Sequence, residues 1–163
     1  MEAIQISLKS KVPLIFCGDF ENQNLKNEVF KYVDNKKIIY LGMLKYQEAL
    51  KLISNAIAGF VLFHPGPNHN NSLPNKLFEY MSCGTPILGT NFIKWKEIID
   101  DNGCGFTSDF NDIEAFVKKV NFYKNNLFEL QTTKNNCLKT IKKFDWLKQE
   151  ATLLREYKLL IEK

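Results

Sequence analysis

The sequence has little histidine, no paired-cysteine motif and no long apolar run. Its four cysteines show no CxxC spacing, and neither of the two histidines lies at a zinc-ligand spacing from them. This pattern argues against a zinc site and against a disulfide framework. It is typical of reduced, buried thiols in a cytosolic protein. The cysteines are Cys17, Cys83, Cys104 and Cys137.

A membrane-spanning segment and a strong charge of one sign are also absent. No run approaches the roughly 20 apolar residues of a membrane span, and the N-terminus lacks the apolar core of a signal peptide. The net charge of +4, from 22 basic and 18 acidic residues, is too small and too mixed to favour nucleic acid. It suits an anionic ligand or an anionic membrane surface. We expect a cytoplasmic protein that contacts a membrane at most peripherally.

What the sequence does contain is a regular alternation of short apolar runs and helical patterns. Its 163 residues fit one domain, and the 45% apolar and 25% charged content is ordinary for a globular protein. Apolar strands separated by helices indicate a parallel sheet covered on both faces. The predicted fold class is α/β, a Rossmann-like parallel sheet sandwiched by helices, with a ligand site beyond the carboxyl ends of the strands. The predicted strands are 12–18, 36–42, 58–64, 85–90 and 104–108.

Helical periodicity accounts for much of the remaining chain. Residues 46–56 and 111–123 have helical patterns, and the C-terminal part is helical with a break near 144–146. Trp95 is expected to pack in the core rather than to stack on a ligand. The first helical pattern, EAIQISLKS, looks like the tail of a longer element. We therefore expect a strand and a turn to precede it, so that the chain starts mid-domain.

The segment NNSLPNKLFEYMSCGTPILGT, residues 70–90, combines a helix-start signal with an acid two turns later. Ser72 is a favourable N-cap, and Pro74 is tolerated in the first turn, where N–H groups lack partners. The following Gly-Thr-Pro predicts the end of the helix and the start of a strand. Three apolar side chains at a spacing of four residues are predicted to face the core: Leu73, Leu77 and Met81.

Glu79 is predicted to point away from that core, because it lies about 200° round the helix from Leu77. It stands nearly in line with the helix start at Ser72, about 10 Å along the axis. A helix N-terminus attracts a phosphate, and a carboxylate at that distance can accept both hydroxyls of a ribose. The combination predicts a cradle for a nucleoside diphosphate. A capped helix with a solvated acid is the simpler alternative.

The run from residue 64 to residue 106, HPGPNHNNSLPNKLFEYMSCGTPILGTNFIKWKEIIDDNGCGF, resembles the donor-binding signature of retaining GT-B glycosyltransferases of family 4. The form SLPNKLFEYMxxGTPI is typical of bacterial surface-polysaccharide members. PLIFCGDF and IIYLGML are similar to earlier strands and turns of that family. The resemblance implies the C-terminal half of a GT-B fold that binds a UDP- or GDP-sugar without a metal or another cofactor.

The resemblance assigns a role to each part of the motif. Glu79 takes the place of the ribose-binding acid, the second Glu of the family's E-x7-E motif. Residues 72–74 lie where backbone amides meet the diphosphate and the sugar, although Pro74 has no N–H to donate. Gly18 lets the first loop approach the ligand, and the base is held near 44–45. The implied contact residues are Gly18, Leu44, Lys45, Asn71, Ser72, Leu73, Pro74, Lys76 and Glu79.

The sequence departs from the family pattern at two points. Asn71 stands eight residues before Glu79, where the first acid of the motif belongs, and an amide carries no charge. The Arg/Lys pair that neutralises the diphosphate normally precedes the helix with which this chain begins, and Lys76 is a candidate to replace it in part. The N-terminal acceptor domain is likewise expected to be absent. Residues 1–163 would then form one nucleotide-sugar-binding domain.

The predicted function is the donor half of a retaining transfer of a sugar to a polysaccharide or lipid-linked acceptor. Helix ends and basic residues would stabilise the leaving diphosphate. No catalytic residue is assigned, and the isolated domain is expected to be inactive. Two alternatives stay open: a non-catalytic nucleotide-binding fragment or subunit that needs a separate acceptor-domain protein, or a relative of the GT-B sugar epimerases.

Overall fold

The computed structural model describes residues 1–34, 36–144 and 146–161. Strands and helices alternate from α1 to α6, and every described strand pairing is parallel. The predicted α/β class is therefore confirmed, with each predicted strand region containing a shorter observed strand. The strands are β1 (Leu14–Phe16), β2 (Ile38–Tyr40), β3 (Gly59–Val61), β4 (Ile87–Thr90) and β5 (Gly105–Ser108).

Helices flank the strands and extend beyond them. The predicted helix at 111–123 is present, and Asp112 caps it by accepting a hydrogen bond from the N–H of Ala115 at 3.1 Å. The predicted C-terminal break is also present between η1 and α8, with residue 145 itself outside the described residues. The helices are α1 (Glu2–Ser10), α2 (Gln23–Phe30), α3 (Tyr46–Asn55), α4 (Asn75–Ser82), α5 (Ile93–Ile99), α6 (Ile113–Asn125), α7 (Leu127–Thr140), η1 (Ile141–Phe144) and α8 (Trp146–Ile161).

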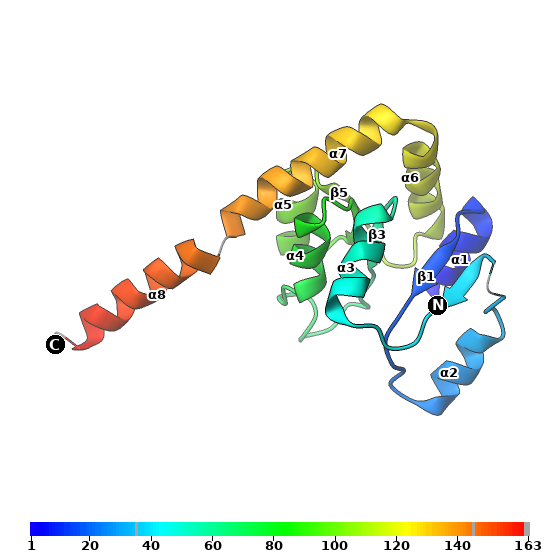
Figure 1. The fold of residues 1–163 in the computed structure, drawn as a ribbon, viewed down its shortest axis with the longest axis horizontal. Helices are drawn as coiled ribbons and strands as arrows, with labels where there is room; N and C mark the ends of the chain where they lie inside the picture. The colour runs from blue at the N-terminus through cyan, green and yellow to red at the C-terminus, as the bar shows by residue number, and fades with distance from the viewer. Residues whose placement is uncertain (35, 145, 162–163) are drawn as a thin grey trace.

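The parallel strands are divided between two sheets. β1 pairs with β2, and β3, β4 and β5 form the second sheet with β4 in the centre. Helices α4, α5 and α7 gather around the second sheet, while α1 packs against α6 and connects directly to β1 (Figure 1). A cavity of about 690 Å³ lies between the sheets and is lined from both sides by β1 and β3.

Tyr80 of α4 packs directly against β3. A Cβ atom at Gly59 would stand only 2.5 Å from the Tyr80 ring, so the ring lies directly on the β3 backbone. The Tyr80 hydroxyl also donates to the Phe60 carbonyl at 3.5 Å. The ring thus occupies space beside β3 and closes one wall of the cavity.

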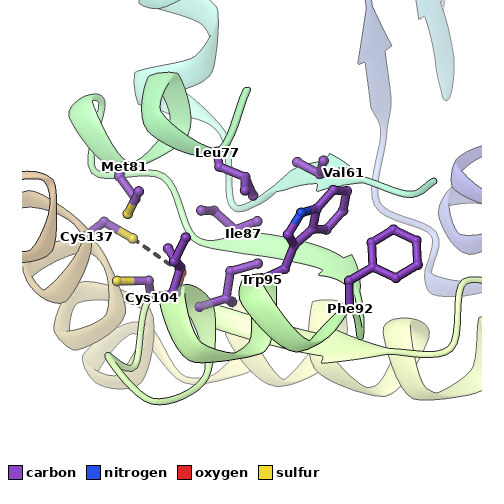
Figure 2. Close-up of a cluster of buried hydrophobic side chains, with 10 residues drawn as sticks. Val61, Leu77, Met81, Ile87, Phe92, Trp95, Cys104 and Cys137 are labelled. Atoms are coloured by element: carbon purple, nitrogen blue, oxygen red, sulfur yellow. Dashed lines mark hydrogen bonds between the residues drawn. The ribbon is translucent and has the colours of Figure 1, made fainter. Parts of the chain in front are cut away.

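The second sheet carries the main apolar core (Figure 2). Leu77, Met81 and Trp95 are fully buried in it, as predicted. Leu73, however, is 42% exposed. The prediction for Leu73 was wrong because α4 begins at Asn75, after Leu73, so the helical spacing of four residues does not extend back to it.

The cysteines divide into two groups. Cys104 and Cys137 are buried side by side in the core, where the Cys137 thiol donates to the Cys104 carbonyl at 3.3 Å (Figure 2). Cys17 is exposed, and Cys83 is half-buried. The expectation of buried thiols is therefore wrong for Cys17, because it follows β1 at the edge of the cavity. All four are free, and the described residues contain no cluster able to hold a metal ion.

In the described part of the chain, no helix has both the length and the apolar content that crossing a bilayer requires.

The turn before β2 depends on one carboxylate. Asp34 Oδ1 accepts hydrogen bonds from three consecutive backbone N–H groups, those of Lys36, Lys37 and Ile38, at 3.0, 2.7 and 2.9 Å. These bonds favour the charged form and lower the pKa of Asp34 to about 2.

We predict that Asp34→Ala lowers the Tm by a few degrees at neutral pH. Because the folded-state pKa lies below the ordinary value of 3.8, the stabilisation is complete above about pH 4 and is lost as pH falls toward 2. The Tm difference between wild type and variant should shrink over that window in calorimetric scans. Asp34→Asn, which keeps an acceptor without the charge, should fall between them. A pH-independent difference would contradict this explanation.

Candidate functional site

The N-terminus of α4 keeps backbone donors free. Pro74 occupies the N-cap position without a side-chain hydrogen bond. The N–H groups of Leu73, Asn75 and Lys76 donate to no acceptor within the described part of the chain. Free N–H groups at a helix start carry a partial positive charge, so this end of α4 can bind an anion.

Ser72 does not cap the helix, and that prediction was wrong. Its hydroxyl donates to the carbonyl of His69 at 3.0 Å, and its own N–H donates to the same carbonyl at 3.2 Å. The Ser72 carbonyl accepts a hydrogen bond from the indole N–H of Trp95 at 2.7 Å. Ser72 therefore connects the loop before α4 to the core instead of capping the N-terminus of the helix.

Glu79 and Lys76 lie on the side of α4 that faces the cavity. Both line it, one helical turn apart, whereas Leu77 and Met81 of the same helix are fully buried in the core. Glu79 is half-buried and Lys76 is exposed. The prediction that Glu79 points away from the core side of the helix is thus confirmed, and its carboxylate borders an open space large enough for a ligand.

The loop after β1 is held by β2. Gly18 has a φ of 118°, and a Cβ there would meet no atom within 4 Å. Its N–H donates to the carbonyl of Gly42 at 2.9 Å, and its carbonyl accepts from the hydroxyl of Tyr40 at 2.8 Å. Because both of its peptide groups already have partners, Gly18 can contribute an open backbone surface but no free donor.

In the turn before α3, the backbone groups of Lys45 are hydrogen-bonded and those of Leu44 have no partner in the described part of the chain. The N–H of Lys45 donates to the Glu48 carboxylate at 3.1 Å, and the Lys45 carbonyl accepts from Glu48 and Ala49 as the helix starts. These bonds cap α3 and use the backbone groups of Lys45. Leu44 makes no backbone hydrogen bond within the described residues. Leu44 is therefore the better of the two for holding a ligand through its main chain.

The structure brings together only part of the predicted site. The cavity contains Lys76 and Glu79 in its wall, along with Cys17, the neighbour of Gly18. The remaining predicted residues, which do not line it, are Gly18, Leu44, Lys45, Asn71, Ser72, Leu73 and Pro74. Asn71 is exposed.

Sequence reasoning missed an aromatic wall near the end of β1. Phe16 and Phe20 line the cavity, and their rings pack against Tyr40 with centroids 5.1 and 5.2 Å apart. Tyr80 completes the wall from α4. The apolar runs of the predicted strands do not indicate a gap between two sheets. The sequence pattern therefore cannot distinguish an aromatic side chain in a cavity wall from one in the core.

Most of the chain matches a known protein family. A family model described as "Glycosyl transferases group 1" matches residues 1–143. The chain belongs to this family. The resemblance recognised in the sequence around Glu79 is therefore confirmed, and the chain is a glycosyltransferase domain of the group 1 type.

The individual relatives have low sequence identity to this chain. The chain is 26% identical to the O-antigen chain mannosyltransferase B of Escherichia coli, over 98% of this chain and 40% of that protein. Among solved structures, it is similar to the Anabaena protein HepE in complex with UDP-glucose, with a TM-score of 0.74, 18% identity, and coverage of 94% of this chain and 44% of HepE. Sucrose-phosphate synthase from Thermosynechococcus elongatus has a TM-score of 0.77, 14% identity, and coverage of 98% and 42%.

These matches fix the fold and the extent of the similarity. Matches at 14% and 18% identity show that the chain folds like half of a GT-B glycosyltransferase. The chain spans less than half the length of each of these relatives.

We predict that Trp95→Phe loosens the loop before α4. The substitution keeps an aromatic ring in the core but removes the N–H that holds the Ser72 carbonyl, at a cost of about 0.5–1.5 kcal/mol for the lost hydrogen bond. Amide hydrogen exchange in residues 66–74 should accelerate. The matched control is Thr85→Val, which removes a buried hydroxyl bonded to the Ile53 carbonyl at 2.7 Å, away from this loop. Equal acceleration in both variants would indicate general destabilisation only.

Proposed function

We propose that the chain is the donor-binding domain of a retaining glycosyltransferase, which holds a UDP- or GDP-sugar for transfer to a polysaccharide or lipid-linked acceptor. The observation that carries the proposal is the arrangement on α4. Free N–H groups at its start, the Lys76 ammonium and the Glu79 carboxylate stand in succession along one helix beside a cavity.

This order matches the parts of a nucleoside diphosphate. The diphosphate binds at the helix N-terminus, where free N–H groups and the side chain of Lys76 supply positive charge. The ribose hydroxyls donate to Glu79, about one turn further along the helix. The same donors stabilise the negative charge that develops on the diphosphate as the sugar leaves. The helix end and Lys76 can therefore act on the leaving group without a metal ion.

The names of the relatives support the ligand and acceptor classes. One similar structure contains UDP-glucose, and one sequence relative is an O-antigen chain mannosyltransferase. We propose a sugar nucleotide as donor and a surface polysaccharide or its lipid-linked precursor as acceptor, which places the protein in the cytoplasm at the inner face of the cell membrane. Because the chain covers less than half of these relatives, we propose that the acceptor binds to a further domain or partner protein.

The exposed amide at position 71 favours one alternative. Asn71 carries no charge where the family motif has an acid, so any electrostatic contribution of that acid to transfer is lost. A nucleotide-binding subunit without activity of its own would tolerate this change. Nucleotide binding without sugar transfer, even when an acceptor-domain partner is supplied, would favour this alternative.

We predict that Glu79→Ala weakens UDP or GDP binding by about 1–3 kcal/mol, roughly 5- to 150-fold in Kd, because charged hydrogen bonds to the ribose are lost. Isothermal titration calorimetry measures the change. Glu97→Ala removes an exposed acid from α5 and should bind like the wild type. If the wild type binds neither nucleotide, the proposed function fails. If wild type and Glu79→Ala bind equally, Glu79 is not part of the site.

We also predict that bound nucleotide protects Cys17 from alkylation. Cys17 is exposed and lines the cavity with Glu79, whereas Cys104 and Cys137 are buried and should react slowly in any state. Mass spectrometry after a maleimide pulse measures modification of each thiol. UDP or GDP should slow labelling of Cys17 in the wild type and much less in Glu79→Ala. Labelling of Cys17 that is unaffected by saturating nucleotide would place the ligand outside this cavity.

A further inference from the structure

The turn between α6 and α7 exposes large apolar side chains. Leu127 and Phe128, the first two residues of α7, are 74% and 80% exposed, and Phe122 near the end of α6 is 40% exposed. Exposing adjacent apolar side chains to water at a turn is unfavourable, and such patches commonly mark contact surfaces. We call residues 118–128 the α6–α7 tip.

The α6–α7 tip is also basic. It contains three lysines and no acidic residue, and Glu129 directly after it still leaves the surface net positive. Lys118 and Lys124 are exposed. The Lys119 ammonium lies 4.9 Å from the ring centroid of the exposed Phe122, so a cation and an aromatic ring adjoin on this surface. Apolar side chains surrounded by lysines fit the boundary between acyl chains and anionic headgroups.

The position of the tip separates it from the proposed nucleotide site. α6 follows β5 and returns along the strands, so its end lies near their amino ends, whereas the loop before α4 follows the carboxyl end of β3. The α6–α7 turn and the loop before α4 accordingly lie at opposite ends of the sheet (Figure 1). A domain that covered the carboxyl ends of the strands would leave the tip accessible.

We propose that the α6–α7 tip docks on an anionic phospholipid bilayer. Leu127 and Phe128 enter the headgroup region, and Lys118 and Lys124 contact anionic headgroups. The apolar pair supplies binding to any bilayer surface, and the lysines supply preference for negative charge. This docking is independent of nucleotide binding, because the two surfaces do not overlap.

Flotation of the full chain with lipid vesicles tests the proposal. The probes are vesicles of phosphatidylcholine alone and of phosphatidylcholine mixed with phosphatidylglycerol. The wild type should float with the anionic vesicles, and added salt should weaken this. The double variant Leu127→Ser/Phe128→Ser should lower the partition coefficient on anionic vesicles by about tenfold or more. The double variant Lys118→Gln/Lys124→Gln should lower it about fivefold and remove the preference for anionic lipid.

Two controls separate the tip from other apolar surfaces. Ile93→Ser changes a side chain that is 78% exposed on α5 and should leave flotation unchanged. Leu153→Ser/Leu160→Ser changes exposed residues of α8 and should retain most of the binding. The proposal is overturned if the wild type does not float, or if the α8 variant abolishes flotation while the tip variant does not. A change from dimer to monomer in the tip variant on sedimentation, with unchanged flotation, would instead make this face an interface between copies.

Discussion

The hydrogen bond from the Trp95 indole to the Ser72 carbonyl joins the apolar core to the loop that opens α4. The indole ring is fully buried and packs edge-on against Phe63 and Phe92, with centroids 5.4 and 4.8 Å away. A buried indole N–H needs an acceptor, and this one finds it in the loop rather than in the sheet. The core therefore sets the position of the backbone just before the helix N-terminus. Any shift in how α5 packs on the sheet would be transmitted to Ser72.

Tyr80 has a comparable role for Glu79. The two residues are neighbours on α4, so their side chains leave the helix about 100° apart. The Tyr80 ring is held against Gly59, and burial, with the charge of Glu79 as a second cause, raises its pKa to about 12. The phenol thus stays protonated at neutral pH and keeps donating to the Phe60 carbonyl. With that ring fixed on β3, Tyr80 and Glu79 line the same cavity from neighbouring positions of α4.

Periodicity predicted the parts of the structure that depend on local pattern. Leu77 and Met81 were placed correctly because their spacing lies wholly within α4, and Glu79 followed from the same geometry. The start of α4 was misplaced because Ser72 can cap a helix or bond to its own turn, and here its hydroxyl donates a hydrogen bond to the carbonyl of His69. The Ser72 carbonyl is in turn held by Trp95, which is distant in sequence. The exposure of Cys17 and the aromatic wall around Phe20 depend on the gap between two sheets, which alternating apolar runs cannot indicate.

The three loops expected to hold a nucleotide differ in what their backbones have left to offer. Gly18 gives its N–H to Gly42 and its carbonyl to Tyr40. Lys45 uses its peptide groups to cap α3. Within the described residues, the N–H groups of Leu73, Asn75 and Lys76 at the start of α4 instead have no acceptor. The loops at Gly18 and Lys45 have bonded their own backbone donors, so they are fixed in place and can define the shape of a binding surface. The start of α4 has unbonded N–H groups in the described structure, so it carries a partial positive charge. Under the proposed function, peptide groups whose orientation the helix already fixes supply positive potential together with Lys76, although the loops around them contain few basic side chains.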